Sequence, residues 1–299
     1  MAIFLYKGVG LAILLQTPAA AQPVPPVDTV AVLWARVRAD SQDARAWFEL
    51  GRSYLNRHLP DTADAALGRA AALDEGALGD SARTFRMFAW GDRALAAWRT
   101  SGMEAAADVW AHLPETTKLS AELQELGENL LRACPARGVL VTAGPLDTHA
   151  AWYLRFARGL RPDLVIVPLE AWQSDSTFRG RVARELRLAP VPAGRREDVE
   201  GRLVSVGDRR PLCASRGFER APLRGARWTS RPLVWVTGKV GADRVAPEDF
   251  VFAAMRLALD HSATWAPPAM AIYRRSAAAT PALCRSMKTF AIAREAGCR

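Results

Sequence analysis

The residues best spaced for chemistry lie in one short loop, residues 142–149 (TAGPLDTH). An apolar, β-branched run precedes the loop, and apolar residues at helical spacing follow it. In parallel α/β sheets, ligands gather at the carboxyl ends of the strands, where the first turn of a helix offers free amide donors. We therefore expect Asp147, Thr148 and His149 to face any bound group, and they form the candidate ligand loop.

A second interpretation gives Asp147 a structural role as the N-cap of that helix. A capping carboxylate accepts hydrogen bonds from the free amides of the first turn and contributes about 1 kcal/mol. It would also repel a phosphate, and the loop lacks the Gly-x-Gly-x-x-Gly spacing of dinucleotide-binding proteins. Both interpretations of Asp147 stay open, and no cofactor is assigned.

Other chemical signatures are missing from the sequence. The four histidines are scattered at positions 58, 112, 149 and 261, and no cysteines show the Cys-x-x-Cys spacing of zinc or redox sites. We therefore assign no metal. No Gly-x-Ser-x-Gly nucleophile motif occurs, so no catalytic residue is assigned. Whether the protein is an enzyme stays uncertain, and a non-enzymatic role is favoured.

The elements around the loop predict an α/β domain over residues 134–299. Strands at 139–142 and 164–167 flank a single helix, which makes a βαβ unit with parallel strands and a right-handed crossover. We expect a Rossmann-like domain with a mainly parallel sheet. Its further elements would be helices at 177–188, 246–261 and 282–296, a buried strand at 232–237, and possible strands at 202–206 and 269–273. Residues 189–230, rich in Pro, Gly and Arg, read as a functional surface loop or a partly mobile segment.

The preceding part, residues 22–133, is rich in alanine and helical in pattern. Residues 47–54 (WFELGRSY) place Trp47, Leu50, Gly51 and Tyr54 in the spacing W-x2-L-G-x2-Y. This motif resembles the opening of a tetratricopeptide repeat, and the family's small, large and small positions in the second helix are matched by Ala63, Leu67 and Ala70. The resemblance covers residues 29–113 and implies a stack of helical hairpins, in which small residues let two helices approach closely.

Neighbouring repeats are needed to bury the faces of a single one. Residues 29–39 would supply a preceding half-repeat. A degenerate second copy would use Trp90, Ala94, Ala97, Ala106, Trp110 and Leu113, with a turn at 100–102. The spacing between this copy and the first repeat predicts an inserted segment at about 76–83. Residues 118–132 would form a helix that caps the stack and joins it to the next domain.

The α/β part resembles a second family over residues 137–172. The matching positions are Gly144, Asp147, Thr148, Trp152, Tyr153, Arg161, Pro162 and Asp163. They are similar to a segment of the soluble C-terminal region of a multi-spanning membrane protein family of unknown function that includes eukaryotic O-mannosyltransferases. The chain has none of that family's transmembrane helices, and Pro145 replaces its usual extra acidic or amide residue. The resemblance therefore implies an accessory domain, with Arg161 and Asp163 at the start of a strand and Trp152 packing the helix on the sheet.

The first residues predict export. A short apolar run reaching residue 15 is followed by small residues, with Ala19 and Ala21 in the A-x-A relation, which is the pattern of a signal peptide over residues 1–21. An uncleaved anchor stays open because the segment before the apolar run is weakly charged. No stretch approaches the roughly 20 apolar residues of a membrane span. We expect a periplasmic or extracellular protein.

An oxidising compartment gives the four cysteines a structural meaning. Of the three possible sets of pairings, we favour Cys284 with Cys298, which would staple a C-terminal helix, and Cys134 with Cys213 across the α/β domain. The alternative is four buried free thiols.

The charge balance points only weakly to a partner. A net charge of +9 would attract polyanions, yet the basic residues are nearly all arginine and form no dense run, so nucleic acid is not favoured. Among the 10 tryptophans, Trp172, Trp228 and Trp265 lie in less regular segments and are candidates for a sugar-stacking face.

Two functions are compatible with these features. Helical-repeat stacks bind peptides and proteins on concave surfaces, so the first hypothesis is an exported tetratricopeptide-repeat protein that serves as an interaction or scaffold module of the cell envelope. The second is a periplasmic accessory protein that binds or processes a glycan or lipid-linked sugar at the loop 142–149. The corresponding partners are a protein or peptide, or a glycan.

Overall fold

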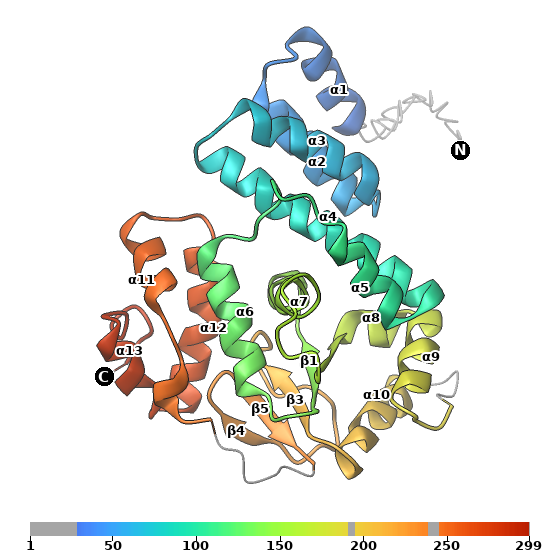
Figure 1. The fold of residues 1–299 in the computed structure, drawn as a ribbon, viewed down its shortest axis with the longest axis vertical. Coiled ribbons are helices and arrows are strands. Elements are labelled where there is room, and N and C mark those ends of the chain that lie inside the picture. The colour runs from blue at the N-terminus through green and yellow to red at the C-terminus, as the bar shows by residue number, and fades with distance from the viewer. Residues whose placement is uncertain (1–28, 191–194, 239–244, 299) are drawn as a thin grey trace, which may run out of the picture.

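The computed structural model describes residues 29–190, 195–238 and 245–298. The predicted signal peptide and cleavage point lie outside these residues. In the upper part of Figure 1, the helices α1 (Thr29–Ala39), α2 (Ala44–Asn56), α3 (Pro60–Leu73) and α4 (Ala77–Ser101) form a row, and α5 (Met103–Ala111) follows at the end of α4. The helix α6 (Ala121–Ala133) lies lower in the same view, next to a small sheet that has further helices around it.

The hairpin of α2 and α3 contains all seven residues of the repeat signature. Leu50, Ala63, Leu67 and Ala70 are fully buried. A Cβ atom on Gly51 would lie 2.5 Å from Leu67 Cγ, so only glycine allows the two helices this approach. Tyr54 accepts a hydrogen bond from Trp34 Nε1 at 2.6 Å, and the ring of Trp47 meets that of Trp34 edge-on with 5.8 Å between centroids. The signature residues thus pack α1, α2 and α3 against one another.

The second pair of helices differs from the prediction at its start. Residues 77–83 are the first turns of α4, which runs unbroken for 25 residues, so the extra length is a longer helix and not an inserted segment. The predicted turn is present, because Gly102, with φ +108°, separates α4 from α5. Asp74 accepts hydrogen bonds from the amides of Gly76 and Gly79 and so fixes the start of α4.

The sheet has five strands in the order β2-β1-β3-β5-β4. They are β1 (Val139–Thr142), β2 (Val165–Pro168), β3 (Leu212–Ser215), β4 (Thr229–Arg231) and β5 (Val234–Thr237). β1 pairs in parallel with β2 and β3, whereas β5 pairs antiparallel with β3 and β4. The sheet is therefore mixed and not mainly parallel, because the chain returns from β3 through β4 and β5 without the helical crossover that parallel pairing needs.

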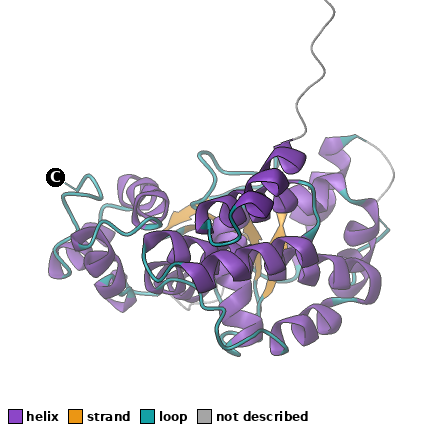
Figure 2. Cartoon of the chain, turned by 90° about the horizontal axis from the view of Figure 1, so that it is seen from above, coloured by secondary structure: helices purple, strands orange, loops and turns teal. Residues whose placement is uncertain are grey.

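Helices surround the short strands when the molecule is seen from above (Figure 2). The βαβ unit is present, with α7 (Pro145–Trp152) and the π-helix η1 (Tyr153–Ala157) between β1 and β2. Between β2 and β3 come α8 (Leu169–Ser174), α9 (Ser176–Glu185), α10 (Arg196–Val204) and the 3-10 turn η2 (Ser205–Asp208). After β5 come η3 (Pro247–Asp249), α11 (Ala253–Asp260), α12 (Ala266–Ala279) and α13 (Leu283–Thr289).

Two predicted strands are wrong. Residues 202–206 belong to α10 and η2, and residues 269–273 lie inside α12. A short apolar run does not distinguish a strand from a buried helical segment, and Ala269, Ile272 and Tyr273 are buried at helical spacing. The closing helix is also shorter than predicted, because α13 ends at Thr289 and turns follow.

The apolar side chains form two cores that divide within α4. One core joins α1–α3 to Ala82 and Ala89 of α4. The other joins Met87, Ala94 and Trp98 of α4 to α5, α6, the sheet and the C-terminal helices. The division between the two cores thus lies inside α4.

Both favoured cysteine pairings are present as disulfides, Cys134–Cys213 and Cys284–Cys298. The first joins the end of α6 to β3, and the second ties α13 to the C-terminal turns. Within the described ranges, no helix combines the length and the apolarity that crossing a membrane requires.

Candidate functional site

The strand order places a natural crevice at the carboxyl edge of the sheet. From β1 the chain passes through α7 to β2 on one side, and from β2 it passes through α8–α10 to β3 on the other side of β1. The connections that leave β1 and β3 therefore run toward opposite edges of the sheet, to β2 and to β4. In open α/β sheets, ligands bind at such a switch point, outside the carboxyl ends of the strands.

A cleft of about 660 Å³ occupies this position. Its wall includes a residue that follows each parallel strand: Ala143 after β1, Leu169 after β2 and Phe218 after β3. The remaining lining residues come from α8, α10 and the segment after β3, and they are Glu170, Gln173, Arg196, Glu197, Glu200, Glu219, Arg220, Pro222, Leu223 and Arg224. The volume lies in the range of small-molecule sites, which is about 300–1,000 Å³.

Glu200 of α10 organises one wall of the cleft. Its buried carboxylate accepts hydrogen bonds from Gln173 Nε2 at 2.7 Å and from Arg196 Nε at 2.8 Å. Its other oxygen accepts one from the amide of Arg224 at 3.3 Å. A single carboxylate thereby fixes α8, α10 and the segment after β3 relative to one another.

Three other charged side chains at the cleft are free. Glu170, Glu219 and Arg220 are exposed, and within the part of the chain that the structure describes their side chains form no hydrogen bond or ion pair. A free carboxylate accepts hydrogen bonds and a free guanidinium donates up to five. The cleft thus offers unused acceptors and donors beside the apolar surfaces of Leu169 and Phe218.

Asp147 braces the loops on either side of the switch point. Its carboxylate accepts hydrogen bonds from the amides of Ala143 at 2.8 Å and Gly144 at 2.9 Å. It also accepts one from the hydroxyl of Ser215, at the end of β3. Burial raises the pKa of the Asp147 carboxyl, whereas these hydrogen bonds act in the opposite direction. The N-cap of α7 is Gly144 and not Asp147, which reaches back from the third helical position.

The other two residues of the candidate ligand loop point into the interior. Thr148 Oγ1 lies 2.7 Å from Thr142 Oγ1, so the two hydroxyls hydrogen-bond to each other. The ring of His149 packs against Phe88 of α4 with 4.8 Å between centroids, and a Cβ on Gly91 would lie 2.6 Å from His149 Cε1. Both side chains are buried, so the expectation that Thr148 and His149 face a ligand is wrong.

Burial has a strong effect on His149. It lowers the pKa of the imidazole to about 3, and Nδ1 has no hydrogen-bond partner among the described residues. The ring is therefore neutral at pH 7 and works as an aromatic packing group between α4 and α7.

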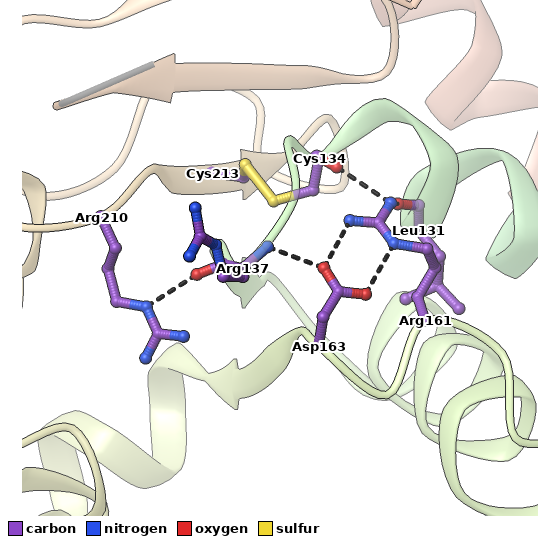
Figure 3. The surroundings of a disulfide bond; sticks show 7 residues. All are labelled: Leu131, Cys134, Arg137, Arg161, Asp163, Arg210 and Cys213. Carbon is purple, nitrogen blue, oxygen red and sulfur yellow. Dashed lines mark hydrogen bonds and ion pairs between the residues drawn. A yellow bond between two sulfur atoms is a disulfide. The ribbon is translucent and has the colours of Figure 1, made fainter. Parts of the chain in front are cut away.

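The opposite, amino-terminal edge of the sheet is tied together (Figure 3). Arg161 donates two hydrogen bonds to the carboxylate of Asp163, at 2.9 and 3.0 Å, and others to the carbonyls of Leu131 and Cys134. The Asp163 carboxylate also accepts a hydrogen bond from the backbone amide of Arg137 at 2.7 Å. Its hydrogen bonds with the Arg161 guanidinium lower the pKa of Asp163 to about 2. Arg161 and Asp163 therefore lie just before β2 and connect it to the end of α6 and to the segment before β1.

The tryptophans are only partly as expected. Trp172 is fully buried and donates to the carbonyl of Val199 at 3.0 Å, so it belongs to the core and not to a binding face. Trp152 donates to the carbonyl of Ile166 in β2 at 3.1 Å and so anchors α7 to the sheet. Trp228 and Trp265 are half-buried, and neither lines the cleft.

Most of the cleft was not visible in the sequence. Its walls come from residues 196–200 and 218–224, inside the stretch predicted as a functional loop or mobile segment. That stretch contains α10 and the central strand β3. β3 has only four residues, LCAS, with no alternation and no β-branched side chain, so Cys213 was the one signal that could have placed it.

These features define the class of the protein: a helix-rich chain of α and α/β parts with a small five-stranded mixed sheet and a polar cleft at the carboxyl edge of its parallel strands. Comparison of the chain with known proteins finds no matching family model, no matching curated protein and no matching solved structure.

Proposed function

We propose that the protein binds a glycan at the cleft between the segments that leave β1, β2 and β3, and that this part of the chain is a Rossmann-like ligand-binding domain. The observation that carries the proposal is the position of the cleft at the point where the strand order reverses. The loop 142–149 contributes Ala143 directly and Asp147 as a brace beneath it.

The lining of the cleft favours a neutral, polyhydroxylated ligand. Four carboxylates, three guanidiniums and one amide line it, so the cleft carries charges of both signs and does not select for an anion or a cation by charge alone. A sugar hydroxyl both donates and accepts, and so it can use a free carboxylate such as Glu170 and a free guanidinium such as Arg220 at once. Phe218 supplies an aromatic surface for the apolar face of a sugar ring.

We further propose that the protein works in an oxidising, exported compartment, as its first residues predict. Two disulfides among four cysteines support this proposal, because such bonds persist in secreted and periplasmic proteins and are rare in the cytosol.

Saturation-transfer NMR on the full chain with maltotriose, chitotriose and mannotriose tests glycan binding. At least one trisaccharide should bind, and Arg220→Gln and Glu170→Gln should each weaken it roughly tenfold through loss of a charged hydrogen bond. Because both residues are exposed and unpaired, the melting temperatures of the two variants should stay close to that of the wild type.

Matched substitutions at exposed positions away from the cleft serve as controls. Arg38→Gln on α1 and Glu104→Gln on α5 remove the same charges and should leave the affinity unchanged. Absence of binding by all three trisaccharides, or equal loss in the control variants, would remove the glycan proposal.

A second proposal concerns the helical hairpins, which we infer to be tetratricopeptide-like and to bind a protein of the cell envelope. Part of their surface is already used, because Phe85 and Phe88 of α4 contact Trp265 at 5.4 and 5.6 Å between centroids. What supports the proposal is the remaining surface on α2, where the exposed Arg52 lies over the rings of Phe48 and Phe85 at 5.7 and 5.3 Å. A peptide carboxylate and an apolar side chain could bind there together.

The whole chain has to be used to test the scaffold proposal. Residues 22–133 alone would expose Trp98, Trp110 and Leu123, which are buried in the core shared with the sheet. A partner cross-linked in envelope extract should be lost with Arg52→Glu and retained with Arg38→Glu. Retention by both variants would count against a site on α2.

A further inference from the structure

A second, smaller cavity adjoins the cleft. It has a volume of about 210 Å³ and is lined by residues at the start of α7, after β3 and on α12: Ala143, Gly144, Pro145, Leu146, Asp147, Gly217, Pro268, Ile272 and Arg275. Ala143 lines both cavities. The two spaces therefore share a wall at the residue that follows β1, whose amide donates to Asp147.

The second cavity is mostly apolar although it contains two charged residues. Asp147 is buried, and its oxygens already accept from the amides of Ala143 and Gly144 and from Ser215. Arg275 donates from Nε to the carbonyl of Arg216 at 2.7 Å and from Nη2 to that of Gly217 at 3.2 Å, which uses two of its five N–H donors. The other lining residues carry no polar side chain, so most of the remaining surface is hydrocarbon and backbone.

The two spaces thus differ in chemistry. The cleft presents free carboxylates and a free guanidinium, whereas the second cavity presents proline, leucine and isoleucine side chains. Its volume corresponds to about seven water-sized groups, at roughly 30 Å³ each. That is room for a short alkyl chain or one ring.

We propose that the ligand is an amphiphile: a sugar head in the cleft and an alkyl or aryl group that passes over Ala143 into the second cavity. The proposal rests on the glycan-binding function proposed above and adds the class of group attached to the sugar. Burial of apolar surface in the second cavity would then supply affinity, while the cleft would select the head.

Gly144 provides the variant that isolates the second cavity. A Cβ built on this residue meets no atom within 4 Å, and its backbone is extended, with φ −161° and ψ −172°. Alanine at this position therefore fits the fold, and a leucine side chain starts from the wall of the cavity with no atom in contact with its Cβ. Neither substitution changes a side chain of the cleft.

Isothermal titration with methyl and hexyl β-glycosides of glucose, mannose and N-acetylglucosamine tests the proposal. In the wild type, the hexyl glycoside of the preferred sugar should bind at least about tenfold more tightly than the methyl glycoside. The ratio should fall to near one in Gly144→Leu and to an intermediate value in Gly144→Ala. Arg220→Gln should weaken both glycosides by the same factor.

The outcomes separate this inference from the function on which it rests. Equal binding of methyl and hexyl glycosides in the wild type overturns the amphiphile while leaving the glycan site intact. A hexyl advantage that persists in Gly144→Leu also overturns it, because the chain would then bind elsewhere. If no glycoside of either kind binds, both the glycan site and the amphiphile are refuted.

Discussion

At the amino-terminal edge of the sheet, a disulfide and an arginine–aspartate pair join the segments that enter β1, β2 and β3. At the carboxyl edge, the segments that leave the same strands line a cleft of about 660 Å³. Hydrogen bonds to Glu200 and Asp147 connect these segments as well, but among the described residues Glu170, Glu219 and Arg220 at the cleft have no partner. The difference shows how a small sheet can be cross-linked at one end and still offer a binding surface at the other.

The disulfide at the tied edge should have the largest effect on stability. Cys134 and Cys213 are 79 residues apart, whereas Cys284 and Cys298 are 14 apart. The loop-entropy argument gives about 4 kcal/mol for the first bond and about 3 kcal/mol for the second. Chemical denaturation of Cys134→Ala/Cys213→Ala should show the larger loss, with Cys284→Ala/Cys298→Ala as the matched control. A larger loss of stability in Cys284→Ala/Cys298→Ala would mean that the disulfide at the amino-terminal edge is not the one that stabilises the fold most.

Arg161 should rank next. Arg161→Ala removes the hydrogen bonds to Leu131, Cys134 and Asp163 and leaves a carboxylate and two carbonyls without their donor, at a cost of about 3 kcal/mol. Arg161→Lys keeps the charge but loses the planar guanidinium with its paired donors. This variant should therefore be more stable than Arg161→Ala but less stable than the wild type. NMR titration should also show the pKa of Asp163 rising from about 2 toward its usual value. If the pKa stays low in Arg161→Ala, Arg161 is not its cause.

His149 in the interior and Asp163 at the amino-terminal edge should respond to acid in different pH ranges. The pKa of His149 is about 3 in the folded protein, below its usual 6.5. The unfolded chain therefore binds the extra proton first, and stability falls as the pH drops from 6.5 toward 3, by about 2 kcal/mol at pH 5. Asp163 has a lowered pKa of about 2, so the stability it contributes is present above its usual pKa of 3.8 and is lost only as the pH falls from there toward 2.

The contribution of His149 has to be isolated by substitution. Burial raises the pKa of Glu125 to about 7 and that of Asp92 to about 6, so these two groups make the folded state more stable as the pH falls and oppose the effect of His149. Urea unfolding at pH 7 and pH 5 should show that the free energy of unfolding decreases less on acidification in His149→Leu than in the wild type. The exposed His261 provides the control, since His261→Leu should leave the difference unchanged. If the free energy of unfolding decreases equally in His149→Leu and in the wild type, the imidazole of His149 is not the cause of the decrease.

Asp147 should have the smallest effect on stability, although it lies at the centre of the open edge. Asparagine offers one acceptor oxygen where the carboxylate has two, so one of the amides of Ala143 and Gly144 loses its bond. Burial makes the charged carboxylate costly, and removal of that charge offsets part of the loss, which leaves about 1–2 kcal/mol. Glycoside affinity should nevertheless fall, because the loops after β1 and β3 are no longer held together. Unchanged affinity in Asp147→Asn would show that this brace does not shape the cleft.

Local patterns predicted the parts of the molecule that depend on neighbours in sequence. The spacing of Trp47, Leu50, Gly51 and Tyr54 fits a helix hairpin because small and large residues must alternate on facing helices. The βαβ unit followed from two apolar runs around one helical segment. Residues 269–273 were misassigned for the same reason, since an apolar run of five residues carries no period long enough to separate a strand from a helix.

The site could not be predicted in the same way. Asp147 was recognised as a residue of interest, but its third partner, Ser215, lies 68 positions further along the chain. Glu200 connects residues 24 and 27 positions away. Interactions of this kind leave no periodic trace in the sequence, and the four residues of β3 are too few to show one.

The sequence by itself determined the helical hairpin and the βαβ unit, because propensity and periodicity are local properties. It favoured the two cysteine pairings, and the tertiary structure decided them. Only the tertiary structure decided that His149 packs inward, that β3 lies beside β1, and that the segments after β1, β2 and β3 surround a cleft. The reason is physical: a cleft is a property of surfaces from distant segments, and its position depends on where the strand order reverses, which is fixed only when all the strands have paired.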